Sequence, residues 1–183
     1  MIEVRPYNDQ SAMAVLSQLD PYDLMEAEAT RGEAVTHLSL FADWRAMQGY
    51  RLASWVVFDD ETCTCPFALV ALGHTGQRGV AGAALLARDH RRFRRPLLQL
   101  ARLIRTEMPS WCNEAGVTRI EARAWASHPR ASAFLKLIGF THETDMPGFG
   151  RDGSQMFRQF AWTNPRCLAP SPNEDSHVLD ENA

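Results

Sequence analysis

The sequence predicts an α/β domain with a mixed, mostly antiparallel sheet of about six to seven strands that is flanked by helices. Two patterns carry this prediction. Apolar and polar residues alternate in several short runs, as in strands with one buried face, and apolar residues recur at three- and four-residue steps between those runs, as in helices. At 183 residues and 45% hydrophobic composition, the chain can bury an ample core without disulfides or metals.

The predicted elements follow one another in a definite order along residues 1–162. The expected strands cover 2–5, 51–58, 66–73, 80–86 and 117–125, a stretch that opens at Phe140, and 155–162. The expected helices cover 9–19, 21–29, 33–47, 91–108 and 131–138. Asp20 precedes Pro21 and is expected to cap the second helix. The polar turn at 59–62 predicts a hairpin, and the continuously apolar run at 80–86 predicts a central strand.

The segment from His128 to Phe140 is the most informative part of the chain. Its apolar positions form one face of a short helix: Ala131, Phe134, Leu135 and Ile138. Gly139 is expected to end that helix in a left-handed conformation before Phe140 opens a strand. This unit resembles the "Asn-x-x-Ala-x-x-Phe-Tyr-x-x-x-Gly-Phe" segment of the GNAT acyltransferase superfamily, and the order of elements is similar to that of the family.

The resemblance implies that a strand and a helix separate to hold the pantetheine arm of acetyl-CoA, with Ala131 at the start of that helix. It also implies that the pyrophosphate binds after the central strand, where Arg88, Arg91 and Arg92 stand. The glycines of the family pattern "Gln/Arg-x-x-Gly-x-Gly/Ala" are missing there, because no glycine lies between Gly82 and Gly116. Without them the backbone cannot close around phosphates in the usual way. We therefore expect acetyl-CoA to bind weakly or not at all.

Five arginines occur among the eight residues from Arg88 to Arg95. A solvent-facing flank of an amphipathic helix is the plainest interpretation. Guanidinium groups also pair with phosphate oxygens, so a coenzyme or nucleotide phosphate is a second interpretation. A nucleic acid or an acidic protein surface is the third.

Candidates for catalysis are few. Leu135 occupies the position of the family's catalytic tyrosine and has no proton to donate. His128 occupies the position of its asparagine and could act as a general acid or base, although capping of the helix start is the commoner role. Glu121 is the best remaining candidate for a base, although it shares a strand face with Arg119 and Arg123 and could belong to an ion-pair ladder.

Four segments further resemble a GNAT-like branch encoded by tailed bacteriophages, some of whose members are internal virion or morphogenesis proteins. These segments are 2–6, 21–29, 90–95 and 135–141. The match implies partners among phage structural proteins or copies of the chain itself, in the host cytoplasm or the virion. Two functions remain open: a catalytically eroded module of virion structure or assembly, which the missing glycines and tyrosine favour, and an active N-acetyltransferase that acetylates an amine.

Charge is distributed unevenly along the chain. Residues 1–61 contain 4 basic and 11 acidic side chains, whereas residues 62–162 contain 14 and 7. This asymmetry predicts an oriented contact with another molecule.

Residues 163–183 form an acidic, proline-containing tail, expected to be disordered or docked on a partner. The four cysteines lack the spacing of a zinc site, no apolar run is long enough for a membrane span, and we expect no metal.

Overall fold

The computed structural model describes residues 1–60 and 64–167. Cys63 and most of the predicted acidic tail, residues 168–183, lie outside the described residues. The predicted final strand extends to Thr163 and is followed by the short 3₁₀ helix η2 (Pro165–Cys167).

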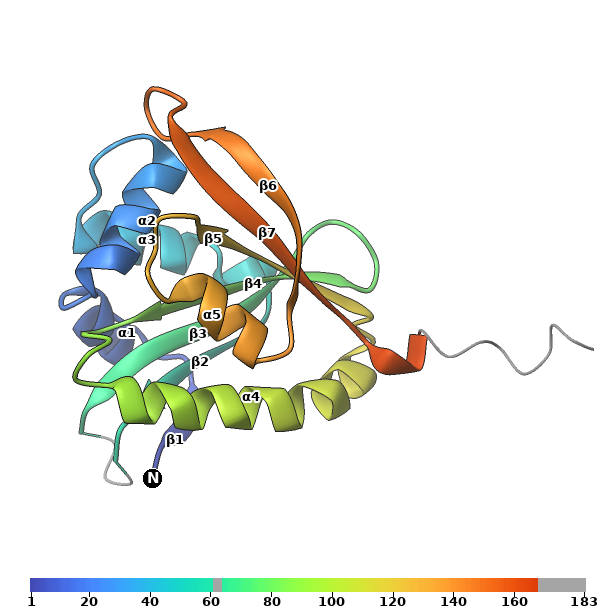
Figure 1. The fold of residues 1–183 in the computed structure, drawn as a ribbon. Coiled ribbons are helices and arrows are strands. Elements are labelled where there is room, and N and C mark those ends of the chain that lie inside the picture. The colour runs from blue at the N-terminus through green and yellow to red at the C-terminus, as the bar shows by residue number, and fades with distance from the viewer. Residues whose placement is uncertain (61–63, 168–183) are drawn as a thin grey trace, which may run out of the picture.

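A seven-stranded sheet forms the centre of the molecule, as Figure 1 shows. Its strands are β1 (Glu3–Pro6), β2 (Arg51–Phe58), β3 (Pro66–His74), β4 (Val80–Ala87), β5 (Arg119–Trp125), β6 (Thr141–Phe149) and β7 (Gln155–Thr163). They lie in the order β1-β2-β3-β4-β5-β7-β6. All neighbours are antiparallel except β4 and β5, which are parallel. The predicted mixed, mostly antiparallel sheet is confirmed.

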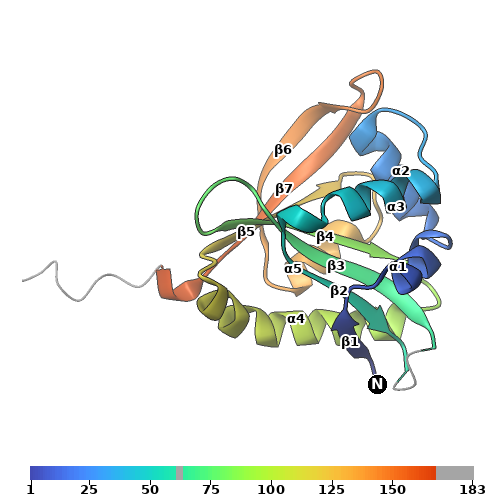
Figure 2. The ribbon, with the colours of Figure 1, turned by 180° about the vertical axis from the view of Figure 1, so that it is seen from behind.

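Five α-helices cover this sheet: α1 (Asp9–Leu16), α2 (Pro21–Arg31), α3 (His37–Ala46), α4 (Arg94–Ala115) and α5 (Ala131–Leu137). A 3₁₀ turn, η1 (Gln48–Tyr50), leads into β2. Helices α4 and α5 lie over one face of the sheet, and α1 and α3 lie over the other, as the two opposite views in Figures 1 and 2 show. Helix α2 packs near the end of β5, where Ala29 shares a small apolar cluster with Trp125 and Phe157.

The alternation along the strands explains the two layers. In β2, Val56 and Phe58 pack in the cluster that includes α1 and α3. Val57, between them, faces the opposite side and packs in the cluster that includes Phe93 and Leu100. All three strand residues are buried because helices cover both faces of the sheet.

All five helices differ in extent from the sequence prediction: α1 ends at Leu16 rather than 19, α2 and α5 differ by one or two residues at their ends, and α3 and α4 differ most. Helix α4 begins at Arg94 rather than 91 and continues through Pro109 to Ala115, where the left-handed Gly116 ends it. A proline inside a helix removes one backbone donor but does not have to end a long helix that is packed on a sheet. Helix α3 begins at His37 because Thr36 and Ser39 form a capping box there.

Two local predictions are confirmed, the left-handed glycine after α5 and the side-chain cap of α2. Gly139 has a φ of 101°, the left-handed conformation expected at the end of α5. The Asp20 carboxylate accepts a hydrogen bond from the Tyr22 backbone N–H and so caps α2. Within the described residues, none of the helices combines the length and the apolar character that crossing a bilayer requires.

Candidate active site

The parallel strands β4 and β5 pair over only part of their length. Their register joins Val80 to Arg119, Ala81 to Ile120 and Gly82 to Glu121. Beyond these pairs, β4 continues to Ala87 and β5 to Trp125, with no further pairing between these two described strands. Residues 83–86 of β4 therefore lie at an edge where a bound extended molecule could pair with the backbone.

A cavity of about 1140 Å³ occupies this region and is lined mainly by apolar side chains. It extends between the sheet and α4, and its wall includes Leu135 and Phe134 of α5. Ligand sites of small molecules commonly measure roughly 300 to 1,000 Å³, so the cavity is large enough for a cofactor-sized molecule. We call this space the cleft.

One stripe of α2 supplies polar groups to the cleft. Asp23, Glu26, Ala27 and Thr30 all line it. Their spacing of three, four and seven residues places them on one helical face. The helix begins immediately before this stripe because Asp20 caps it and Pro21 occupies its first turn.

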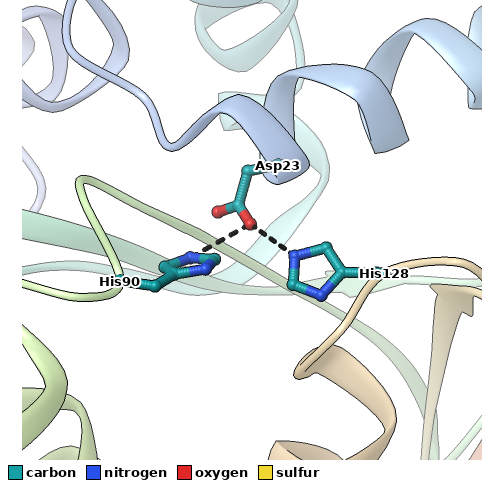
Figure 3. A group of neighbouring side chains, drawn as sticks. All are labelled: Asp23, His90 and His128. Atoms are coloured by element: carbon teal, nitrogen blue, oxygen red, sulfur yellow. Dashed lines mark hydrogen bonds and ion pairs between the residues drawn. The ribbon is translucent and has the colours of Figure 1, made fainter.

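Asp23 joins three segments that are far apart in the sequence. His90, in the turn before α4, and His128, before α5, both direct Nε2 at Asp23 Oδ1 over 3.1 Å, as Figure 3 shows. The other oxygen, Oδ2, accepts a 2.7 Å hydrogen bond from the Ala87 N–H at the end of β4. Asp20 adds a contact of 3.6 Å to His90 Nδ1. We refer to Asp20, Asp23, His90 and His128 as the Asp23 cluster.

The Asp23 cluster favours a carboxylate at Asp23 and a protonated ring at His90. Burial opposes ionisation of Asp23, but the hydrogen bonds from His128 and His90 outweigh it and lower the pKa of Asp23 below its ordinary value. Burial also opposes protonation of His90, but Asp23 and then Asp20 outweigh it and raise the pKa of His90. An imidazolium at His90 satisfies both carboxylates, because each of its two N–H groups faces one of them.

The hydrogen bonds of His128 define its tautomer. Its Nδ1 accepts the backbone N–H groups of Arg130 (3.1 Å) and Ala131 (2.9 Å), so this nitrogen carries no proton. The proton of a neutral ring therefore lies on Nε2 and is donated to Asp23. His128 thus caps α5 and anchors its start to α2.

The ligand atoms of Asp23, His90 and His128 lie within 4.8 Å of one another, a spacing compatible with a metal ion. A metal-binding histidine usually donates its second ring N–H to an acceptor. His128 cannot do so here, because its Nδ1 already accepts two backbone N–H groups. The arrangement fits a hydrogen-bonded carboxylate–histidine cluster better than a metal centre, and the expected lack of a metal stays a prediction.

Glu26 lies one helical turn beyond Asp23 and also faces the cleft. Burial raises the pKa of Glu26 to about 7, and the neighbouring groups that lower it only partly offset this effect. At neutral pH its carboxyl group is therefore divided between the protonated and ionised forms. Such a group can accept a proton from an amine and release it again.

The turn between β4 and α4 uses its own backbone donors. The N–H groups of Arg91 and Arg92 donate to Asp89 Oδ1 over 3.1 and 2.9 Å, and the His90 N–H donates to Asp20 Oδ2 over 2.8 Å. The Phe93 N–H donates to the Asp89 carbonyl oxygen. Carboxylate and carbonyl oxygens of the chain thus occupy the donors that would otherwise cradle phosphates at this helix start.

The predicted cofactor-binding residues lie around this turn and the start of α5. Arg88 donates to the Pro66 carbonyl oxygen over 2.7 Å and to Gln18, so its guanidinium serves packing within the chain. Arg91 and Arg92 are exposed. Ala131 lines the cleft, although its N–H is bonded to His128. Their roles toward a cofactor stay predictions.

The predicted catalytic residues are brought to the same cleft. Glu121 and His128 both line it, together with Leu135 at the tyrosine position of the family pattern. Arg119 Nε donates to Glu121 over 2.8 Å and Arg119 Nη1 donates to Glu143 over 2.9 Å, so Glu121 belongs to an ion-pair arrangement of the kind described above. His128 is buried and caps α5. Glu121 and His128 therefore both lie at the cleft, and their catalytic roles stay predictions.

Glu26 and Asp23 were not predicted from the sequence. Their signal was the polar stripe at three- and four-residue steps on α2, which a search for family motifs does not detect. The cluster partner His90 lies 67 positions from Asp23 along the chain and was grouped only with the neighbouring arginines.

Comparison with solved structures identifies the class of fold. A GNAT-family acetyltransferase from Bacillus anthracis aligns with a TM-score of 0.66 at 11% identity, covering 89% of this chain and 95% of that one. Spermidine N-acetyltransferase from Vibrio cholerae, in complex with CoA and spermine, aligns with a TM-score of 0.63 at 14% identity. The alignment covers 92% of this chain and 98% of that one. The ribosomal-protein-S18-alanine N-acetyltransferase of Escherichia coli aligns with a TM-score of 0.62 at 15% identity. The alignment covers 90% of this chain and 94% of that one.

These similarities show that the chain has the GNAT acetyltransferase fold. No protein-family profile matches the sequence, and no curated protein is significantly similar to it. The relation to a bacteriophage branch stays a prediction.

Proposed function

We propose that the protein is an N-acyltransferase that moves an acyl group from a pantetheine thioester to an amine, with Glu26 as the proton acceptor. The observation that carries the proposal is a carboxyl group with a pKa of about 7 in the wall of the cleft where β4 and β5 separate. The GNAT fold of the chain supports the same reaction class, and the Vibrio cholerae structure of similar fold contains CoA and spermine.

The residues of the cleft account for the steps of such a reaction. The edge of β4 that does not pair with β5, residues 83–86, can hydrogen-bond the amide groups of a pantetheine arm and orient its thioester. The Glu26 carboxylate removes one proton from the acceptor ammonium. The amine nitrogen then attacks the thioester carbonyl carbon, the carbon–sulfur bond breaks, and the thiolate takes the second proton of the nitrogen. Glu26 returns its proton to water.

Acyl-CoA fits this site only in part. The cleft suits the pantetheine arm, but the turn before α4 offers no free backbone donors at residues 90–93 for the pyrophosphate. We therefore assign no role in phosphate binding to that backbone.

Replacing Glu26 by glutamine tests the proposal. Removing a general base of this kind lowers kcat by roughly 10²- to 10⁴-fold, and the pH dependence near neutrality should disappear with it. Glu114→Gln, on the exposed part of α4 outside the cleft, is the matched control and should retain wild-type turnover. Equal turnover by Glu26→Gln and wild type, with amines and thioesters that the wild type accepts, would exclude Glu26 as the base.

A second candidate function is a rigid interaction module in a virion or its assembly, with phage structural proteins or other copies of the chain as partners. The backbone donors before α4 favour it, because they are already bonded within the chain and so leave less for a coenzyme phosphate. Lack of turnover with every thioester offered, together with incorporation of the chain into particles, would support this alternative.

A further inference from the structure

Four arginines surround the start of α4: Arg91, Arg92, Arg94 and Arg95. All four are exposed, and among the described residues none of them forms an ion pair. The first turn of α4 contains no acidic residue. Positive charges at a helix N-terminus are unfavourable because the helix dipole is positive there. This arrangement costs stability in the isolated chain, and an anionic partner would offset that cost.

The form of the site favours a broad anion over a compact one. A pyrophosphate concentrates its charge in a small volume and is best held by converging backbone N–H groups. Those groups are already bonded in this turn. Exposed guanidinium groups on two sides of a helix start are better suited to carboxylates or phosphates spread over a protein surface.

The basic surface is continuous with the cleft. Arg94 belongs to both, since it also lines the cavity. Arg130, at the start of α5, and Arg123, on β5, also line the cavity and are exposed. An arm attached to a partner on this surface can therefore enter the cleft past Arg94.

The wall of the cleft also suits an aliphatic acyl chain. Three leucines on α4 and α5 line the cavity although they are substantially exposed: Leu98, Leu103 and Leu137. Exposed apolar side chains around a cavity commonly mark a surface that a ligand covers.

We infer that the acyl donor is a thioester on the phosphopantetheine arm of an acidic carrier protein, which docks on Arg91, Arg92, Arg94 and Arg95. The inference rests on the proposed acyl transfer and specifies its donor. The carrier supplies the arm that lies along β4 and a negative surface that replaces the nucleotide of CoA. The reaction is unchanged: the carbon–sulfur bond breaks, the amide bond forms, and the carrier keeps the free thiol.

Calorimetric titration with holo-acyl carrier protein, apo-acyl carrier protein and coenzyme A, compared at the same low salt concentration and repeated at a higher one, tests the inference. We expect holo-carrier to bind at least about ten-fold more tightly than apo-carrier and coenzyme A, with an affinity that falls as salt increases. Coenzyme A binding as tightly as holo-carrier would overturn the inference and leave the proposed acyl transfer standing. If neither coenzyme A nor holo-carrier bound, both the carrier inference and the proposed acyl transfer would be overturned.

Charge reversal locates the contact. Arg91→Glu, Arg92→Glu and Arg95→Glu together should weaken holo-carrier binding at least about ten-fold. The matched control reverses three exposed arginines elsewhere, Arg78, Arg102 and Arg151, with the same change in net charge. Equal weakening by both triple variants would overturn the assigned surface. Equally tight binding of apo-carrier or of a DNA oligonucleotide would show a general polyanion site and would also overturn the inference.

Discussion

Two successive turns of α2 face the same cleft with opposite electrostatics. In the first turn, Asp23 receives hydrogen bonds from His90, His128 and the Ala87 N–H, and its pKa is lowered despite burial. In the next turn, burial dominates at Glu26 and raises its pKa to about 7. Two carboxyl groups three residues apart therefore have different tasks: Asp23 stabilises the walls of the cleft, and Glu26 remains able to exchange a proton.

The structural task of Asp23 follows from the segments that it joins. Its partners belong to the end of β4, the turn before α4 and the start of α5. These segments lie at the separated ends of β4 and β5. The Asp23 cluster therefore fixes the width of the cleft at the end where the strands do not pair with each other.

The largest expected effect comes from removing Asp23. Asp23→Ala leaves His90 buried opposite Asp20 alone and removes the acceptor of the Ala87 N–H, so the free energy of unfolding at pH 7 should fall by roughly 3 to 5 kcal/mol. Urea unfolding measures this loss.

The control for Asp23 is Asp145, which pairs with His142 and Arg158 at an exposed position. Asp145→Ala should cost about 1 kcal/mol or less, because exposed ion pairs contribute little. Similar losses for the two variants would contradict the structural role of the Asp23 cluster.

Glu26 should make the folded protein less stable as the pH rises from about 4.5 to about 7. Its pKa is raised in the folded state, so its protonated form favours folding below pH 4.5, and this contribution is lost as pH rises through about 7. Between these values wild-type stability should decline relative to Glu26→Gln by up to about 3 kcal/mol. Unfolding curves collected across this range would show parallel stabilities for the two proteins if Glu26 had an ordinary pKa.

His90 gives a smaller and separable effect. Its pKa is raised by Asp23 and Asp20, so its stabilisation is complete below the ordinary value of 6.5 and is lost as pH rises through the folded-state pKa. His90→Gln should therefore cost more at about pH 5.5 than at about pH 8.5. Thermal unfolding at both pH values provides the comparison, and a pH-independent cost would show that His90 acts without its charge.

The sequence predicts the elements of this molecule better than its site, and the reason is physical. Periodicity reports which face of a strand or helix is buried, so the strand at 80–86, the helix at 131–138 and the left-handed Gly139 were predictable from local patterns. The pairing of Asp23 with His90 and His128 depends on tertiary packing across the fold. The raised pKa of Glu26 depends on burial by segments far away in the chain, which no local pattern contains.

The most direct test of this account is a carboxyl-detected NMR titration of Asp23 and Glu26 in the folded protein, with Glu26→Gln to assign the signal of Glu26. The account predicts a pKa of about 7 for Glu26 and a pKa below 3.8 for Asp23. A Glu26 carboxyl that titrates near its ordinary value of 4.5, in a protein that remains folded, would contradict the division of tasks between the two turns of α2.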